Sequence, residues 1–423
     1  MVFIDEILTK CLATNGVCID SRKLQFGECF VAIKTHQRDG HHYVTEAFEK
    51  GASLALVDQP EFVINNQCIL VNNTVETLQE LAILHRKNCP NLIVIVVAGS
   101  NGKTTTKELL TAVLSSNYTT FSTLGNLNNH LGVPLSILKI TKDHEVAVIE
   151  IGANHLREHD RLCDIAQPTH ALVTNCGKDH LGGYGSEAAV IRSNLEVYDY
   201  MLKSSGHIFV NENDNVLVNA STAASRSFYG NLTSVTKEYP YLTLSGRIQS
   251  NQLNFSSNLY GRFQKSNIEA ALHIGLHFKV DPKQIQDAIG SYLPTNNRSQ
   301  ILKWHGNTIL LDAYNANPSS MKEMIDYFDH YPIKQKLIIL GAMLELGDAS
   351  EHEHQIVLEQ LNHMDKAKKI FIGDAFQALS KSYDGQFFSD HHQVKQHLES
   401  LALTDHLILV KGSRFYTLEQ IFI

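Results

Sequence analysis

Short apolar runs alternate along the chain with segments in which apolar and polar residues recur at helical spacing. The most apolar run is LIVIVVA at 92–98, and similar runs lie at 146–149 and 171–174. Runs of this length between turn-forming residues are typical of strands covered by helices on both faces, as in a parallel sheet. The pattern therefore predicts an α/β protein with mainly parallel sheets.

The chain is also expected to contain more than one domain, because 423 residues exceed one ordinary hydrophobic core. In the first part, strands at 30–33 and 54–57 flank a helix at about 41–50, and a turn-rich linker follows at 88–91. The predicted units are residues 1–88, 89–296 and 297–423.

The last unit repeats the alternation on a smaller scale. Its four apolar runs are separated by segments of helical periodicity, which predicts a smaller doubly wound α/β domain. The expected strands are 308–311, 337–340, 370–372 and 407–410.

Composition and charge exclude several classes of protein. The net charge is −8, so a nucleic-acid binder, which normally carries a basic patch, is not expected. The seven cysteines include no CxxC pair, which favours reduced thiols in the cytoplasm over a disulfide framework or a zinc site. The N-terminus lacks a signal-peptide pattern, and no apolar run is long enough to span a membrane. We therefore expect a cytoplasmic protein.

The most specific chemical signal is a glycine-containing turn between the run at 92–98 and a helix. Backbone N–H groups in such a turn, together with the positive end of the helix, bind phosphate. We expect Lys103 to neutralise the β- and γ-phosphates of a nucleotide and the Thr104 hydroxyl to bind Mg²⁺. Val97 replaces the first glycine of GxxxxGK[ST], and the alternative is a simple turn with an exposed lysine. The candidate residues are Gly99, Ser100, Asn101, Gly102, Lys103, Thr104 and Thr105.

Two further polar residues follow strands of the same expected sheet. Glu150 ends one strand and His180 follows the next, and the carboxyl ends of parallel strands meet at the crevice where ligands bind. Mg²⁺ often takes only one or two protein ligands, which suits Glu150 beside a phosphate turn. The alternatives are a solvated carboxylate and a structural histidine.

The third unit contributes weaker candidates. Arg298 could bind a phosphate through its planar fork, and Asp312, at a strand end, could accept from ribose hydroxyls. Pro318 suits the first turn of a helix, and KGSR at 411–414 is a second candidate anion site. The alternatives are a linker arginine and a helix cap.

Taken together, these segments resemble the Mur ligase family over essentially the whole chain. NNRSQ, YNANPSSM and GAMLELG are typical of the last-acting ligase among its members. The matching motifs are IDSRK at 19–23, DGHHY at 39–43, GSNGKTTTKELL at 99–110, GNLNNHLGVPLSIL at 125–138, EIGANH at 150–155, TNCGKDHLGGYGS at 174–186, NNRSQ at 296–300, DAYNANPSSM at 312–321, LGAMLELG at 340–347 and KGSR at 411–414.

The resemblance implies a UDP-substrate domain, a central ATPase and a C-terminal Rossmann-like domain. It implies ATP- and Mg²⁺-dependent joining of D-alanyl-D-alanine to UDP-N-acetylmuramoyl-tripeptide, through an acyl phosphate, in peptidoglycan synthesis for the cell wall. These two substrates are the implied partners, and a monomer is expected.

The resemblance also implies roles for individual residues. Lys103, Glu150, His180 and Arg298 are the expected catalytic residues, and Thr104, Glu150 and His180 the expected Mg²⁺ ligands. Besides the turn at 99–105, the expected nucleotide contacts are Asn267, Arg298, Asp312, Asn315 and Asn317. The expected substrate contacts are Ser21, Arg22, Asp39, Gly40, His41, Asn128, Asn129 and His130.

Three positions depart from the family pattern. Asn194 replaces a lysine that the family carbamylates to bridge to a second Mg²⁺, and Lys178 is a candidate to take over that role. Gln264 replaces an asparagine, and Phe415 a glycine. The competing interpretations are a non-catalytic scaffold that binds ATP or the UDP substrate, and another Mur-type ligase such as a folylpolyglutamate synthase relative.

Overall fold

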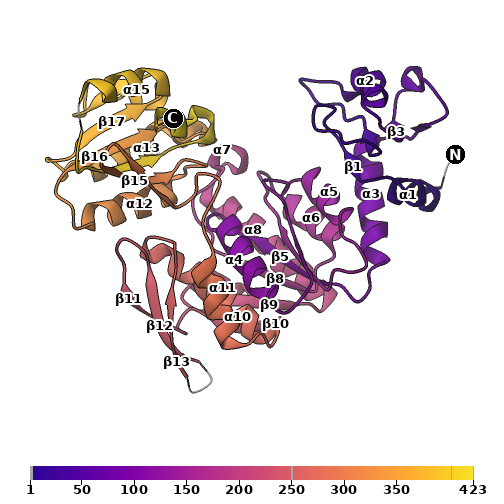
Figure 1. Cartoon of the computed structure of the whole chain (residues 1–423), viewed down its shortest axis with the longest axis horizontal. Helices are drawn as coiled ribbons and strands as arrows, with labels where there is room; N and C mark the ends of the chain where they lie inside the picture. Colours follow the sequence, from indigo (N-terminus) through magenta and orange to yellow (C-terminus); the bar gives the residue numbers. More distant parts are fainter. Residues whose placement is uncertain (1–2, 249–250, 402, 423) are drawn as a thin grey trace.

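The computed structural model describes residues 3–248, 251–401 and 403–422. The structure leaves undescribed residues 1–2, 249–250, 402 and 423. The start of the first expected unit and the end of the third fall among them. Within the described residues the strands form four sheets. The N-terminal part (indigo) and the C-terminal part (yellow) lie at opposite ends of the molecule, with the central part between them (Figure 1).

The first sheet is parallel and follows the order of the sequence. Its strands are β1 (Val17–Cys18), β2 (Cys29–Val31), β3 (Leu54–Val57) and β4 (Cys68–Leu70). The surrounding elements are α1 (Ile4–Leu12), η1 (Gly40–Tyr43), α2 (Val44–Glu49), η2 (Pro60–Phe62) and α3 (Thr74–Lys87). The strand expected at 54–57 is confirmed. The strand expected at 30–33 ends earlier, and the helix expected at 41–50 begins with a 3-10 turn.

The central sheet is parallel throughout, with the order β10-β9-β8-β5-β7-β6. Its strands are β5 (Ile93–Ala98), β6 (Thr120–Ser122), β7 (Val146–Glu150), β8 (His170–Val173), β9 (His207–Asn211) and β10 (Ser225–Tyr229). Its helices are α4 (Lys103–Leu114), α5 (Gly132–Ile137), α6 (Glu158–Ala166), α7 (Leu181–Tyr184), α8 (Glu187–Ser204), α9 (Asn215–Ala220), α10 (Lys265–His277) and α11 (Pro282–Ser291).

Alternate residues of β5 explain why its sequence is apolar throughout. Val94 and Val96 join a core that includes α5, α6 and α8. Ile95 and Val97 join a second core that includes α4, α10 and α11. Because successive side chains of a strand point to opposite faces, both faces of this sheet are buried, as the apolar pattern predicts.

A small antiparallel sheet follows the central one, and the apolar pattern does not predict it. Its strands are β11 (Ser234–Lys237), β12 (Thr243–Ile248) and β13 (Asn251–Ser256). In β12 only Leu244, Gly246 and Ile248 are buried, so the strand lacks a continuous apolar run. The strands β9 and β10 of the central sheet were also not expected from the sequence.

The last sheet has the order β14-β15-β19-β16-β17-β18 and is parallel except for β14. Its strands are β14 (Gln300–Trp304), β15 (Asn307–Asp312), β16 (Lys336–Gly341), β17 (Lys368–Ile372), β18 (Gln386–Phe388) and β19 (Leu407–Lys411). The other elements are η3 (Arg262–Gln264), which precedes α10, and α12 (Pro318–His330), η4 (Gly347–Ala349), α13 (Ser350–Gln360), α14 (Asp374–Gln377), α15 (His391–Ser400), η5 (Arg414–Tyr416) and η6 (Leu418–Phe422).

This sheet confirms the expected doubly wound unit. Its two faces again join different cores, with α12 and α13 on one side and α15 on the other. Pro318 occupies the first turn of α12 as predicted, after Asn317, whose side chain and that of Ser320 form a capping box. Within the described part of the chain, no helix combines the length and apolar character needed to cross a membrane.

Candidate active site

The glycine-containing turn, called the phosphate loop below, lies at the carboxyl end of β5 and has the geometry of a phosphate-binding loop. Gly99 has φ +121° and Gly102 has φ +81°, conformations that favour glycine. A Cβ on Gly99 would also collide with the Thr174 side chain. Helix α4 begins at Lys103, so its free N–H groups and positive end face the loop.

Lys103 lies against this loop. Its ammonium group donates to the carbonyl oxygens of Gly99 and Ser100, at 2.5 and 3.1 Å. Its charge also reaches His159, whose pKa is lowered to about 4, mainly by burial and then by Lys103. The cation is therefore held where a nucleotide phosphate would meet the N-terminus of α4.

The segment after β8 holds the phosphate loop in place. The Ser100 hydroxyl donates to the Asp179 carboxylate at 2.7 Å, and the Asn101 N–H donates to the Asn175 side-chain oxygen at 3.1 Å. The Thr174 hydroxyl donates to the Asn101 carbonyl at 2.6 Å. The register pairs Ala98 with Val173, so the two strand ends are neighbours, as parallel pairing requires.

Glu150 lies beside this loop, because β7 pairs with β5 and places Glu150 opposite Val97. The residue is 2% exposed. Its Oε1 accepts from the Asn128 side-chain amide at 2.9 Å, whereas its Oε2 is buried with no hydrogen-bond partner among the described residues. A buried carboxylate oxygen without a partner is unusual and suits a cation.

These residues fit a Mg²⁺ site that is completed by phosphate oxygens. Glu150 supplies one anionic oxygen, and Thr104 supplies a hydroxyl from the same cavity wall. In the described residues, no group of three or more histidine, cysteine or acidic side chains is arranged to hold a metal. One carboxylate oxygen and one hydroxyl suit Mg²⁺, which keeps several waters and binds substrate phosphates.

His180 lies at the same edge but already has a partner. Its Nδ1 is 2.6 Å from Oε2 of Glu345, which follows β16 in the last unit. The hydrogen bond from His180 lowers the pKa of the Glu345 carboxyl. In this structure His180 therefore joins the central and last units, and its expected role as a metal ligand stays a prediction.

The last unit presents two cations across the cavity. The Arg298 guanidinium stacks on the Tyr314 ring at 3.6 Å, and its buried Nε has no hydrogen-bond partner among the described residues. The buried Lys411 ammonium pairs with the Asp312 carboxylate at 2.6 Å and donates to the Asn315 carbonyl at 3.2 Å. Asp312 therefore serves first as the counter-charge of Lys411.

A direct hydrogen bond connects the last unit with the phosphate loop. The Asn317 side chain donates to the Asn101 side-chain oxygen at 2.8 Å. The same Asn317 caps α12 by accepting from the Ser320 N–H. The start of α12 is thus fixed against the loop that would carry the phosphates.

Together these groups line a cavity of about 840 Å³ between the central and last units. Gly99 and His130 are absent from its wall, and so are the five expected substrate contacts of the N-terminal part. The expected site residues that line it are Ser100, Asn101, Gly102, Lys103, Thr104, Thr105, Asn128, Asn129, Glu150, His180, Asn267, Arg298, Asp312, Asn315 and Asn317.

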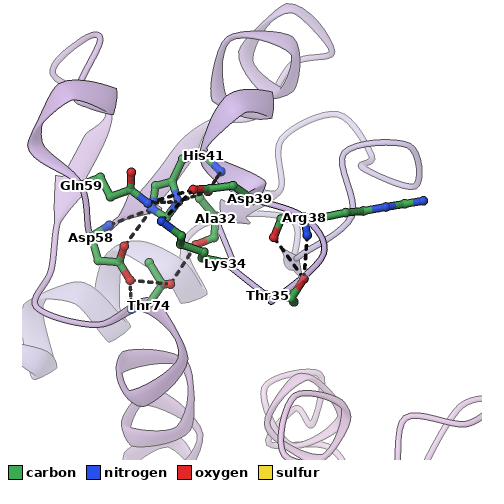
Figure 2. Close-up of polar contacts among 9 residues, drawn as sticks. All are labelled: Ala32, Lys34, Thr35, Arg38, Asp39, His41, Asp58, Gln59 and Thr74. Atoms are coloured by element: carbon green, nitrogen blue, oxygen red, sulfur yellow. Dashed lines mark hydrogen bonds and ion pairs between the residues drawn. The ribbon is translucent and has the colours of Figure 1, made fainter.

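In the N-terminal part, His41 lies between two carboxylates (Figure 2). Its Nδ1 is 2.7 Å from Asp39 and its Nε2 is 3.0 Å from Asp58, and its side chain is 0% exposed. Burial acts to raise the pKa of the Asp39 carboxyl, but hydrogen bonds from the His41 backbone and ring hold it below the usual value. Gln59 also donates to Asp39, and Thr74 donates to Asp58.

The other expected contacts of this part have partners of their own. Arg22 is largely exposed and forms a two-pronged ion pair with Asp20, with both N–O distances 2.8 Å. The Ser21 hydroxyl is 3.5 Å from Glu46. Gly40 approaches the Ile33 backbone so closely that a Cβ would clash. Substrate contact by these residues stays a prediction.

Several residues of the cavity wall were not identified from the sequence. Tyr314 supports Arg298, Asn175 holds the loop, and Glu345 pairs with His180. All three residues lie within motifs that the sequence singled out, and Asn175 also follows the strand β8. Their contacts could not be inferred, because they join segments that are distant in sequence.

Three protein-family models match the chain: the Mur ligase family catalytic domain at residues 14–92, the Mur ligase middle domain at 97–275 and the Mur ligase glutamate ligase domain at 297–414. The UDP-N-acetylmuramoyl-tripeptide–D-alanyl-D-alanine ligase of Bacillus subtilis (strain 168) is 32% identical, over 96% of this chain and 92% of that ligase. The chain belongs to the Mur ligase family. The Escherichia coli (strain K12) ligase of the same name is 30% identical, over 97% and 93% of the two chains.

Solved structures of MurF ligases are also similar to this chain. MurF from Acinetobacter baumannii superimposes with a TM-score of 0.86 at 27% identity, over 96% of this chain and 92% of that one. The MurF ligase of Thermotoga maritima in complex with ADP gives 0.83 at 26% identity, over 97% and 96%. The folylpolyglutamate synthase of Thermotoga maritima gives 0.62 at 13% identity, a likeness of fold alone.

The three departures from the Mur ligase pattern have different surroundings. Asn194, on α8, is buried, and its side-chain amide donates to the Val190 carbonyl at 3.0 Å. Its Oδ1 has no partner within the described residues, and Asn194 is not part of the cavity wall. Lys178 pairs with Glu353 at 2.9 Å, and this contact raises its pKa. A carbamate forms on a neutral amine, so the charged Lys178 is a poor substitute for the missing lysine.

Gln264 connects the central and last units beside the cavity. Its side-chain amide donates to the Ser299 hydroxyl at 2.9 Å, and its oxygen accepts from Asn267 at 2.7 Å. Asn267 in turn accepts from the Thr106 hydroxyl at 3.0 Å. The chain of bonds from α4 to the last unit is complete with glutamine. Phe415 is 74% exposed, and no contact in the structure explains this substitution.

Proposed function

We propose that this chain is an ATP-dependent ligase that joins D-alanyl-D-alanine to UDP-N-acetylmuramoyl-tripeptide in peptidoglycan synthesis. The observation that carries the proposal is the cavity of about 840 Å³ in which the phosphate loop and Glu150 face Arg298 and Lys411. The ligases of the same type from Bacillus subtilis and Escherichia coli support the choice of substrates.

The chemistry requires an anionic carboxylate to attack an anionic phosphate. The terminal carboxylate of the tripeptide attacks the γ-phosphorus of ATP, which gives an acyl phosphate and ADP. The amine of D-alanyl-D-alanine then attacks the acyl carbon, phosphate leaves, and the amine proton passes to a base. Lys103 at the loop and Arg298 from the facing unit lower the repulsion in the first step. Contact between the two units keeps water from the acyl phosphate.

Mg²⁺, when bound by Glu150 and the Thr104 hydroxyl, supplies further positive charge at the phosphates. Asn315 and Asn317 then border the nucleotide from the last unit, and Asn267 from the central one. We assign UDP-substrate binding to residues 1–88, nucleotide binding to 89–296 and closure of the nucleotide site to 297–423. We also propose that the enzyme acts in the cytoplasm as a monomer.

The decisive experiment measures ADP release with each substrate omitted in turn. We expect continued release, over many turnovers, only when ATP, the UDP-linked tripeptide and D-alanyl-D-alanine are all present. Release that needs a different amine acceptor would identify another ligase activity. Nucleotide binding without any substrate-dependent release would identify a non-catalytic scaffold, the interpretation that Asn194 favours.

A further inference from the structure

We infer that Lys178 is a positioning residue that holds the last unit in register with the phosphate loop. This inference deepens the proposed function, because it concerns how the nucleotide site of that same ligase is assembled. It rests on two contacts that Lys178 makes with the last unit and on a close backbone contact nearby.

The first contact fixes the start of α12. The backbone N–H of Lys178 donates to the Ser319 hydroxyl at 3.0 Å. Ser319 lies two residues after Asn317, whose side chain donates to Asn101 of the phosphate loop. The first turn of α12 is therefore held both by the phosphate loop and by the segment that follows β8.

The second contact is an ion pair with α13. The Lys178 ammonium is 2.9 Å from the Glu353 carboxylate, whose side chain is 6% exposed. Removing the cation would leave a buried carboxylate without its counter-charge, which is costly.

Lys178 is also connected to the phosphate loop from its own side. The next residue, Asp179, accepts from the Ser100 hydroxyl at 2.7 Å, and the preceding Gly177 carbonyl accepts from the same hydroxyl at 3.2 Å. A displacement of Lys178 would therefore also displace the hydrogen-bond partners of Ser100 in the phosphate loop. The segment 177–179 thus contacts the nucleotide loop and two helices of the last unit.

A second point of contact prevents rotation about the first. The Gly182 N–H donates to the Glu345 carbonyl at 2.7 Å. A Cβ on Gly182 would lie 2.9 Å from the Gly347 nitrogen and 3.1 Å from the Glu345 oxygen. Only glycine permits so close an approach of two backbones. Two contacts on either side of His180 then set the orientation of Arg298 and Lys411 toward the phosphates.

The test compares Lys178→Met, Glu353→Gln and the double variant of the full-length protein. Calorimetry with a non-hydrolysable ATP analogue and Mg²⁺ reports nucleotide affinity, and steady-state kinetics report kcat and the KM of each substrate. The matched control is Asp326→Asn, which breaks the exposed Lys322–Asp326 pair on α12. A thermal melt of each variant reports its folding.

We expect each single variant to bind the analogue about tenfold more weakly, because misplaced charges bind phosphate poorly. The double variant should be no worse than either single variant, and the KM for the UDP-linked tripeptide should not change. Gly182→Ala, which inserts a methyl group between the two units and leaves Lys178 in place, should weaken analogue binding in the same way. Asp326→Asn should match the wild type.

Unchanged analogue affinity in folded single variants would overturn the inference, as would strictly additive losses or an equal loss of UDP-substrate binding. If Lys178→Met or Glu353→Gln fails to fold, unchanged affinity in Gly182→Ala would overturn it equally. Analogue binding needs no turnover, so the role of Lys178 and the proposed ligase activity are tested independently. A wild type that binds the analogue but never ligates refutes the proposed function alone.

Discussion

Two groups of buried polar residues in this molecule differ in how their hydrogen bonds are satisfied. Around His41, both ring nitrogens and both carboxylates have protein partners (Figure 2). In the cavity between the central and last units, Glu150 Oε2 and Arg298 Nε are buried without partners among the described residues. The completed network stabilises a loop, whereas the unpaired groups that line the cavity are free to bind a ligand. An unpaired polar atom therefore points to ligand binding here because it also lines a cavity.

The largest expected effect comes from Lys103→Ala. Among the described residues, the Lys103 ammonium group donates only to loop carbonyls, so its loss should not destabilise the fold. We expect kcat to fall by about 10³-fold, because a charge that stabilises the transition state is lost. Measurement of ADP release beside a thermal melt checks this, with the exposed Lys142→Ala as control. Near-normal turnover would remove Lys103 from the mechanism.

Glu150→Gln tests whether an unpaired oxygen marks a ligand site. The amide keeps the acceptor for Asn128 but removes the negative charge. We expect turnover to fall by about 10²-fold at a fixed Mg²⁺ concentration, with thermal stability unchanged or higher. Titration of activity with Mg²⁺ should show a higher requirement than in the exposed control Asp143→Asn. A large drop in stability with normal turnover would show that Glu150 has a structural role rather than a ligand-binding one.

His41→Phe tests the satisfied group. Phenylalanine keeps the ring but leaves Asp39 and Asp58 without their shared partner. We expect unfolding in urea to be easier by about 2–3 kcal/mol, with kcat at saturating substrate retained. His42→Phe is the control, because His42 is exposed on the same 3-10 helix. Equal stability of the two variants would show that the cluster does not stabilise this loop.

A third group, of histidine side chains, should give the smallest effect, on the pH dependence of stability. His170, His207 and His277 lie against one another, and His207 and His273 both hydrogen-bond to the Ser227 hydroxyl. Burial first, and then neighbouring histidines, lower the pKa of His170 and of His273 to about 4. Unlike His41, the His170 and His273 rings hydrogen-bond to hydroxyl groups rather than to carboxylates. Their lowered pKa keeps His170 and His273 neutral at pH 7.

The folded state therefore binds fewer protons than the unfolded state below the ordinary histidine pKa of about 6.5. The stability that these rings contribute is present above that pH and is lost as the pH falls toward 4. We expect the urea midpoint to decrease between pH 7.5 and pH 5, and His170→Phe to reduce that decrease. The same decrease in both proteins would exclude His170 as a source of the pH dependence.

The sequence predicted the repeating parts of this fold well. Strands such as β5 and β3 are continuous apolar runs, and Pro318 and the glycine turn carry strong local signals. The sheet β11–β13 was missed because one face of each strand is polar. Its strands therefore resemble loop sequence.

The candidate site was predictable in its parts but not in its contacts. Position at a strand end singled out Glu150, and the phosphate turn singled out Lys103. The pairing of His180 with Glu345 and of Lys178 with Glu353 joins residues more than 160 positions apart. Such pairing depends on how the last unit sits on the central sheet, which no local pattern encodes. Asp39 lies in the same motif as His41, but the second carboxylate, Asp58, was missed for a similar reason, because it comes from a separate loop.

The most direct measurement is mass spectrometry of the UDP-linked product over a range of Mg²⁺ concentrations, with and without bicarbonate. Asn194 offers no amine for a carbamate, and we propose Glu150, whose buried Oε2 has no partner among the described residues, as the anionic Mg²⁺ ligand. We predict that the wild type adds D-alanyl-D-alanine to the tripeptide at sufficient Mg²⁺ and does not respond to bicarbonate. Absence of product at every Mg²⁺ concentration, with product formed only by Asn194→Lys in bicarbonate, would contradict this prediction and identify a non-catalytic scaffold.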